Sequence, residues 1–192
     1  MLDDETYPET GVLVNKLGIK NQNLLYVAEQ KLTMLRLLEL VQHPMKGNFD
    51  LKHLQAIHHH IFQDLYSWAG QLRKVDIGKG NMFCHVPYIQ SESNKLFLKL
   101  KKENFLAELP TEQFAERMAW YFSEINAIHP FREGNGRTER EFIRSLALKN
   151  NYQVEFAQIR NGEILEASRE SFICNYKPME NIFKKILTKI SN

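Results

Sequence analysis

Apolar residues recur at helical spacing in several separate stretches of the chain. Over residues 23–41, 51–65 and 111–128 they stand three or four positions apart, which puts them on one face of an α-helix. Asp50 precedes the second stretch, and an aspartate there caps the free backbone N–H groups of a helix. The same periodicity predicts further helices over residues 91–104, 136–149, 155–172 and 178–190.

The pattern changes between Gly70 and Pro87. Apolar and polar residues alternate over residues 74–77, a Gly-Lys-Gly-Asn segment follows at 78–81, and a second apolar run covers residues 82–86. Two extended runs around a glycine-rich tip are typical of a β-hairpin. Because the sequence contains no internal repeat and no obvious linker, we expect one mainly helical domain with one β-hairpin.

Composition indicates a globular protein without a strong charge. Its 192 residues are 43% hydrophobic, enough for an ordinary core, and no apolar stretch approaches the ~20 residues that span a bilayer. The N-terminus is acidic where a signal peptide is basic, so we expect a cytoplasmic protein that contacts no membrane. Cys84 and Cys174 form no metal-binding pair, and a net charge of +2 does not by itself indicate a nucleic-acid partner.

Residues 129–137, His-Pro-Phe-Arg-Glu-Gly-Asn-Gly-Arg, lie between the end of one predicted helix and the start of the next. A Gly-Asn-Gly triplet is most often only a turn, because both residue types tolerate positive φ. Here, however, Gly134 and Gly136 let the backbone approach a ligand closely. The first N–H groups of the following helix point outward, with the positive end of the helix dipole behind them. This arrangement predicts a site for an anion.

Three arginines strengthen the prediction of an anion site. Arg137, Arg140 and Arg144 are three and four positions apart, so they lie along one face of the predicted helix. The helix dipole disfavours cations near the N-terminus by ~0.3–1 kcal/mol each, so an anionic group should compensate them. Neighbouring glutamates are one candidate, but a polyphosphate bound by guanidinium groups and backbone amides explains more of the placement.

Glu133 and His129 indicate the chemistry. Mg²⁺ usually accompanies nucleotide phosphates and takes only one or two protein carboxylates, so Glu133 is the expected metal ligand. His129 ends the preceding helix, and an imidazole with an ordinary pKa near ~6.5 acts as a general base at neutral pH. A lone histidine after an apolar helix is more often structural, but the nearby carboxylate and glycines favour a catalytic role.

Taken together, residues 129–140 resemble the signature of the Fic family, H-x-F-x-[DE]-G-N-G-R-x-x-R, and every fixed position is filled. Residues 64–73 resemble the segment that leads into the hairpin, or flap, of that family. Residues 7–17 and 83–85 resemble stand-alone bacterial Fic toxins.

The resemblance implies a Fic-type helical bundle that forms a single domain over residues 1–192. It also implies a flap at about residues 71–88 beside the active-site loop. The implied activity is protein adenylylation (AMPylation), a nucleotidyltransferase reaction. In it a base takes the proton of a target hydroxyl group, the oxygen attacks the α-phosphate of ATP, and pyrophosphate leaves. Such transfers depend mainly on positioning and charge stabilisation.

By the same resemblance, His129 is the base and Glu133 holds Mg²⁺. The Gly-Asn-Gly loop would contact the α- and β-phosphates, and the two motif arginines would contact the β- and γ-phosphates. The flap near residues 77–85 would align the target chain by strand addition. The resemblance does not assign the adenine pocket, for which Asn175 and Tyr176 are candidates. The expected ATP-binding residues are Lys79, Gly80, Arg132, Glu133, Gly134, Asn135, Gly136, Arg137 and Arg140.

The resemblance also implies a toxin. Stand-alone relatives modify type II topoisomerases, so the expected partner is such an enzyme with an acceptor serine, threonine or tyrosine. Many Fic enzymes inhibit themselves through a helix with the pattern [S/T]-x-x-x-E-[G/N]. Glu180 and Asn181 fill its last two positions, but Tyr176 stands where Ser or Thr is needed. We therefore expect a separate small antitoxin, with self-inhibition through Glu180 as the alternative.

Two other functions stay open at this point. A Doc-like kinase would invert ATP and transfer its γ-phosphate, but such a relative typically has lysine where this chain has Gly136. A non-catalytic module that binds nucleic acid through the arginines is less favoured, because the base, the carboxylate and the glycines are all present. A zinc site at His53 and residues 58–60 is not expected, because consecutive helical residues diverge by ~100°.

Overall fold

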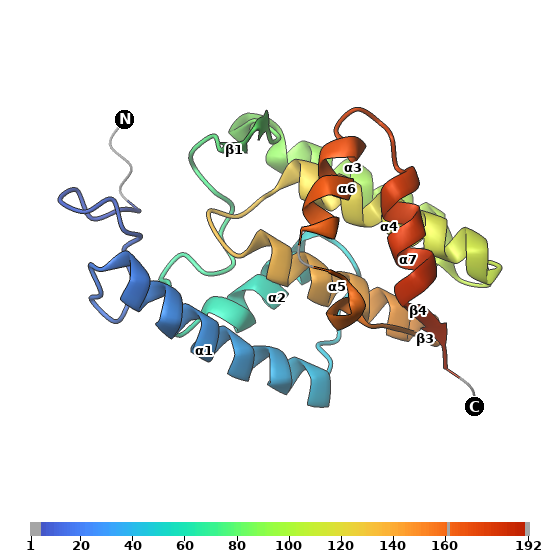
Figure 1. The fold of residues 1–192 in the computed structure, drawn as a ribbon, viewed down its shortest axis with the longest axis horizontal. Helices are drawn as coiled ribbons and strands as arrows, with labels where there is room; N and C mark the ends of the chain where they lie inside the picture. The colour runs from blue at the N-terminus through green and yellow to red at the C-terminus, as the bar shows by residue number, and fades with distance from the viewer. Residues whose placement is uncertain (1–4, 161, 191–192) are drawn as a thin grey trace.

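The computed structural model describes residues 5–160 and 162–190, and most of them are helical (Figure 1). The helices are α1 (Gln22–Gln42), α2 (Leu51–Phe62), α3 (Ile89–Lys102), α4 (Thr111–Ile128), α5 (Asn135–Lys149), α6 (Glu163–Ser171) and α7 (Lys177–Ile186). The strands are short and pair in two antiparallel sheets, β1 (Gly78–Lys79) with β2 (Asn81–Met82) and β3 (Tyr152–Val154) with β4 (Leu187–Lys189). None of the helices described is both long and apolar enough to cross a membrane.

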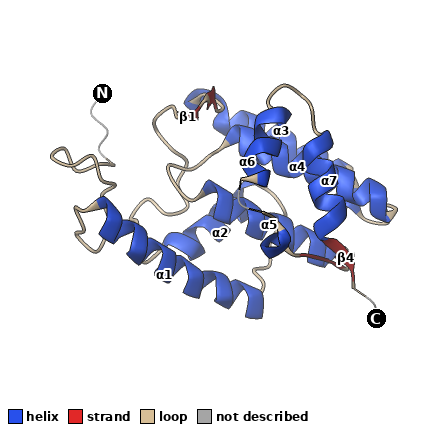
Figure 2. Cartoon of the chain, in the orientation of Figure 1, coloured by secondary structure: helices blue, strands red, loops and turns tan. Residues whose placement is uncertain are grey.

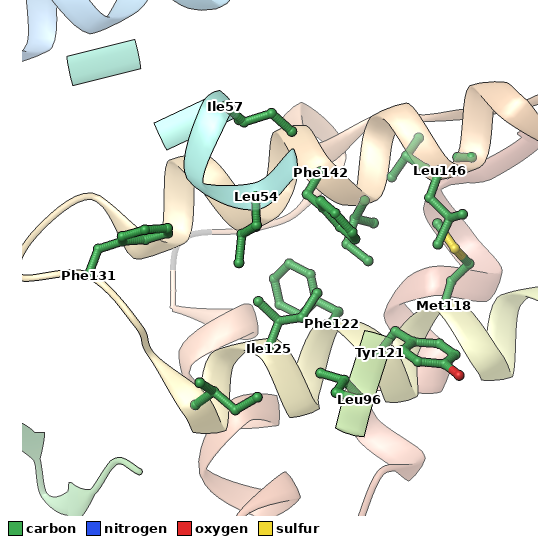
Figure 3. Packing of buried hydrophobic residues seen from close by; sticks show 14 of the residues in the cluster. Leu54, Ile57, Leu96, Met118, Tyr121, Phe122, Ile125, Phe131, Phe142 and Leu146 are labelled. Atoms are coloured by element: carbon green, nitrogen blue, oxygen red, sulfur yellow. The ribbon is translucent and has the colours of Figure 1, made fainter. Parts of the chain in front are cut away.

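α4 lies at the centre of the bundle. It contacts α3, α5, α6 and α7, while α5 also packs against α2, and α1 packs against α2 at the edge of the molecule. Apolar side chains of α2, α4 and α5 meet in the core (Figure 3). The side chains at most 3% exposed include Leu54, Ile57, Met118, Phe122, Ile125, Phe142 and Leu146. This core fixes the end of α4 relative to the start of α5.

The predicted helices are found with two differences near the C-terminus. The cap at Asp50 is confirmed, because its Oδ1 accepts a hydrogen bond from the backbone N–H of His53 at 2.8 Å. The stretch predicted over residues 155–172 is not one helix, since a 3₁₀ turn at Phe156–Gln158 precedes α6.

The helix predicted over residues 178–190 is wrong at its end. It stops at Ile186, and the chain continues as β4, in which Thr188 lies opposite Gln153 of β3. A three-residue strand has too few alternating positions to produce a clear sequence pattern, and tertiary pairing overrides local preference here. Figure 2 shows this second strand pair far from the flap.

A hairpin is found where one was predicted, but its strands β1 and β2 lie almost entirely in the segment expected as the tip, with Gly78 opposite Met82. The runs expected as strands, residues 74–77 and 82–86, are not strands except at Met82. Gly80 forms its tip with a φ of +85°, a conformation that favours glycine. The backbone N–H of Cys84 donates to the carbonyl group of Ala127 at 3.0 Å. This bond ties the end of the flap to the last turn of α4, next to the motif loop.

α1 has an inner and an outer apolar face. The inner face packs against the rest of the molecule through residues such as Leu25 and Leu40, each 2% exposed. The outer face carries apolar residues that stay about half exposed, namely Leu24, Val27, Met34, Leu35, Leu38 and Val41. Contiguous exposed apolar patches of this kind often mark interaction surfaces.

We expect Phe142→Ala to lower the free energy of unfolding by about 3–5 kcal/mol, because it leaves a cavity in a fully buried part of the core. Urea denaturation followed by circular dichroism measures this change. Leu38→Ala on the outer face of α1 is the control, and it should stay within about 0.5 kcal/mol of the unmodified chain. Equal losses for the two variants would contradict this assignment of core and surface.

Candidate active site

The loop between α4 and α5 is closed by one side chain. Asn135, the first residue of α5, accepts a hydrogen bond from the backbone N–H of Phe131 at 2.9 Å and donates one to its carbonyl group at 2.7 Å. Asn135 is 6% exposed and Phe131 is 1% exposed, so both bonds are shielded from water. The amide group is used within the loop, and any contact of Asn135 with phosphate would come from its backbone.

The two motif glycines differ in what surrounds them. Gly134 has a φ of +80°, and a Cβ atom there would lie 2.1 Å from Cζ of Phe62, so backbone and space both exclude a side chain. Gly136 lies in the first turn of α5, where a Cβ atom would be 3.5 Å from Nη1 of Arg140, an ordinary contact. Gly136 therefore leaves space beside this guanidinium group, and the first N–H groups of α5 have no acceptor within the helix.

A cavity of about 330 Å³ opens at this helix start, a volume within the range of small-molecule sites. Its walls come from the motif, the flap and α6, and they include His129, Gly136, Glu139, Arg140, Asn81, Phe83, Ile164, Leu165 and Phe172. Asn175 and Tyr176 are not among the described residues that line it; the apolar lining comes from the flap, α4, α6 and the residue after α6. A larger cavity of about 610 Å³, beside Lys101 and Lys149, contains no motif residue.

His129 is held at its backbone and at its ring. The residue ends α4 in the left-handed conformation, with φ of 48° and ψ of 61°, and its N–H donates to the carbonyl group of Ile125 at 3.0 Å. Its ring lies nearly parallel to the ring of Phe83 in the flap, with 3.8 Å between centroids and 8° between planes. The predicted base therefore lies in the cavity wall with one ring face covered by the flap.

Arg140 and Glu139 bring two ionisable groups to the cavity. Within the described part of the chain, no hydrogen bond or ion pair engages the Arg140 guanidinium group. Burial lowers the pKa of Arg140, and the negative charge of an ionised Glu139 would raise it. Glu139 is 3% exposed, and burial raises the pKa of its carboxyl group well above the ordinary value. The positive charge of Arg140 acts in the other direction and lowers this pKa. An unpaired guanidinium group beside a helix N-terminus is suited to bind an anion.

Arg137 does not accompany Arg140 into the cavity. Its Nη2 donates to Oε1 of Glu29 at 2.5 Å, and its Nη1 donates to Oγ1 of Thr33 at 3.1 Å, both on α1. Glu29 also accepts a hydrogen bond from the Tyr66 hydroxyl group at 2.5 Å. Arg137 thus links α5 to α1, and the expected contact with the β- and γ-phosphates would require it to leave Glu29.

The other expected nucleotide and metal ligands lie outside the cavity wall. The side chain of Glu133 is 42% exposed. Its Oε1 accepts a hydrogen bond from the backbone N–H of Gly134 at 2.8 Å and lies 3.8 Å from Nη2 of Arg137, so Oε2 is the oxygen that a cation could reach. Nε of Arg132 lies 3.7 Å from a carboxylate oxygen of Glu5. Gly80 forms the flap tip, and Lys79 has its backbone in β1 while its side chain lies outside what the structure describes.

His58 supports the motif loop, a role that sequence reasoning missed. Its Nδ1 accepts a hydrogen bond from the backbone N–H of Gly70 at 2.8 Å, so its protonated Nε2 donates to the Glu133 carbonyl group at 3.0 Å. Burial lowers the pKa of His58 to about 4, which keeps the ring neutral in this tautomer. The ring also stacks on Phe131, with 3.9 Å between centroids. Only the run of three histidines marks this residue in the sequence.

A family model and similar curated proteins point to the same family. The model of the Fic/DOC family matches residues 48–147. The chain is 40% identical to "Protein adenylyltransferase VbhT" of Bartonella schoenbuchensis over 98% of its own length, but it spans only 40% of that protein. It is 38% identical to "Probable protein adenylyltransferase y4lH" of Sinorhizobium fredii over 96% of both chains. It is 36% identical to "Probable protein adenylyltransferase Fic" of Escherichia coli over 97% of this chain and 93% of the relative.

Solved structures agree with this family. An N-terminal Fic domain from Bartonella quintana with bound ADP superposes with a TM-score of 0.92 at 30% identity, covering 97% of this chain and 95% of that one. The BepC protein from Bartonella tribocorum with bound AMPPNP gives a TM-score of 0.91 at 29% identity, covering 97% of each chain.

We expect Glu139→Gln to change how stability depends on pH. Because burial raises the pKa of this carboxyl group in the folded chain, only the unfolded chain ionises as the pH rises above the ordinary glutamate value. Stability of the unmodified protein should then fall relative to Glu139→Gln by about 1.4 kcal/mol for each pH unit in that window.

Urea denaturation between pH 5 and 8 measures this difference, with Glu112→Gln at an exposed position of α4 as the control for the substitution itself. Parallel pH profiles for the unmodified chain and Glu139→Gln would contradict the expectation.

Proposed function

We propose, since the chain belongs to the Fic/DOC family, that it is a protein adenylyltransferase that moves AMP from ATP to a hydroxyl side chain of a target protein. The observation that carries this proposal is the cavity, where His129, the helix start at Gly136 and the Arg140 guanidinium group meet. Relatives with this architecture bind ADP and AMPPNP.

In the proposed reaction, His129 takes the proton of the target hydroxyl group, and the oxygen forms a bond to the α-phosphorus of ATP. The bond from this phosphorus to the oxygen that bridges to the β-phosphate breaks, and pyrophosphate leaves with that oxygen. Arg140 and the N–H groups at the start of α5 stabilise the charge on the phosphates, which is the main requirement in such transfers.

Gly136 favours AMP transfer over the Doc-like kinase. A lysine at this position would occupy the space that the glycine leaves beside Arg140. With that space open, the phosphates can lie along the start of α5 with the α-phosphate nearest His129. Binding of nucleic acid as the sole function is less favoured, because the arginine face is divided: Arg137 is paired with Glu29, and Arg144 is paired with Glu141.

We propose that Mg²⁺ is held by the carboxylate of Glu133 together with phosphate oxygens and water. The accessible carboxylate fits this role, and no group of three or more His, Cys, Asp or Glu side chains in the described residues forms a separate metal site. The positive charge of the ion would offset the negative charge of the phosphate oxygens.

The finer parts of the proposal concern regulation and partners. We propose a cytoplasmic toxin that modifies a serine, threonine or tyrosine hydroxyl group of a type II topoisomerase and is inhibited by a small antitoxin. Glu180 pairs with Lys177 at 3.1 Å and is not among the cavity residues, which supports inhibition from outside the chain. The outer face of α1 supports it too, because its apolar residues recur at helical spacing and would accept an amphipathic helix.

The flap offers an edge for the target. Asn81 and Met82 of β2 are exposed, and Asn81 also lines the cavity. An extended target segment that added to this strand would bring its hydroxyl group toward His129.

We expect label from α-labelled ATP to enter proteins of a bacterial lysate incubated with the purified chain, and label from γ-labelled ATP not to do so. His129→Ala should reduce the transfer by about 10²–10⁴-fold, because the general base is lost. His43→Ala, at the exposed end of α1, is the matched control and should keep full activity. Transfer of γ label alone would establish a kinase instead.

We expect Glu180→Gly to leave the rate of the purified chain within about twofold of the unmodified rate, because Glu180 contacts Lys177 and not Arg140. Initial rates of α-label transfer in the absence of any partner measure this. A many-fold increase would mean that Glu180 is a brake and that no antitoxin is needed.

A further inference from the structure

Arg73 is a buried guanidinium group between the flap and the motif loop. It is 2% exposed and lies at the start of the flap region, outside the motif. Its Nε donates to the carbonyl group of His129 at 2.8 Å, and its backbone N–H donates to the carbonyl group of Pro130 at 2.9 Å. Arg73 therefore holds the backbone of the proposed base and of the residue after it.

The same guanidinium group holds both ends of the flap. Nη1 donates to the carbonyl group of Val75 at 2.8 Å on the incoming side, and Nη2 donates to the carbonyl group of Cys84 on the outgoing side. Asp76 lies beside the same group, with its Oδ1 3.6 Å from Nη1 of Arg73. Its carboxylate accepts hydrogen bonds from the backbone N–H of Val86 at 2.8 Å and from the His85 ring. One side chain thus joins three backbone segments.

Only arginine can make this set of contacts. Its planar group presents five N–H donors in fixed directions, whereas lysine has three donors on one nitrogen and cannot reach carbonyl groups on opposite sides. A buried carbonyl group that loses its donor is left unsatisfied. The three segments would therefore shift relative to one another if the guanidinium group were removed.

The backbone and the ring of His129 are therefore both set by the flap region. Arg73 fixes the carbonyl group of a residue in the left-handed conformation, and Phe83 covers its ring. We propose that Arg73 is a positioning residue that couples the placement of the flap to the orientation of the base. This inference rests on the proposed function, in which the flap aligns the target and His129 takes its proton.

Arg73→Lys tests the proposal, with Arg117→Lys as the matched control. Arg117 is a partly buried arginine of α4 that pairs with Glu103 at 2.8 Å and contacts neither the flap nor the motif. Initial rates of α-label transfer from ATP to bacterial lysate proteins are measured over a range of ATP concentrations. Arg73→Lys should lower the maximal rate at least about tenfold while the half-saturating ATP concentration stays within about twofold, because misplacement of the base does not remove the phosphate ligands.

Hydrogen exchange provides a second measurement that needs no activity. The amides of Phe83, Cys84 and His129 should exchange at least about tenfold faster in Arg73→Lys than in Arg117→Lys. Phe83→Leu keeps an apolar side chain but removes the stacked ring, and it should also lower the maximal rate without changing ATP half-saturation.

The outcomes separate the two proposals. If the unmodified chain transfers no α label, the proposed function fails, while hydrogen exchange still tests the coupling of the flap to the loop. If Arg73→Lys keeps the unmodified rate and exchange, or loses ATP affinity at an unchanged maximal rate, Arg73 does not position the base.

Discussion

The pair of hydrogen bonds between the Asn135 side chain and the Phe131 backbone is the constraint on which the site depends. The bonds close the loop on itself before α5 begins, so the direction of the first turn of α5 is fixed relative to the end of α4. The core between these two helices then holds both ends of the loop. As a result the free N–H groups of α5 and the imidazole group of His129 face one cavity. Neither group would be directed there by the local sequence alone.

Buried polar side chains from outside the motif hold this loop from several directions. His58 donates to the carbonyl group of Glu133, Arg73 donates to the carbonyl group of His129, and Glu29 of α1 accepts a hydrogen bond from Arg137 of the motif. All of these groups are largely shielded from water. In such a buried environment, a polar group that loses its hydrogen-bond partner is costly because water cannot replace the partner. A loop supported in this way can present strained backbone, such as the left-handed conformation of His129, without collapsing. The precision of the site therefore comes from residues that would not touch the substrate.

The sequence predicts the helices, the hairpin and the motif because their signals are local. Apolar spacing defines α1 to α5, and Gly134 and Gly136 reveal a close backbone approach at a helix start. The roles of Glu29, His58 and Arg73 could not be predicted, because each depends on a contact with a segment distant in sequence. The pair of β3 with β4 was missed for a related reason, since each strand is too short to carry a pattern and gains its structure from the other.

Arg137 and Arg140 show how the fold divides a set of like charges. Both lie on the same face of α5 by sequence spacing, yet Arg137 is neutralised by a carboxylate of α1, and Arg140 is left at the cavity. The carboxyl group next to Arg140 is that of Glu139, and an ionised group there would cancel the charge that an anion needs. Burial raises the pKa of Glu139 well above the ordinary value, which favours the uncharged carboxyl group and so reduces its opposition to the positive charge of Arg140. The desolvation that makes Glu139 costly to ionise is thus what keeps Arg140 available to phosphate.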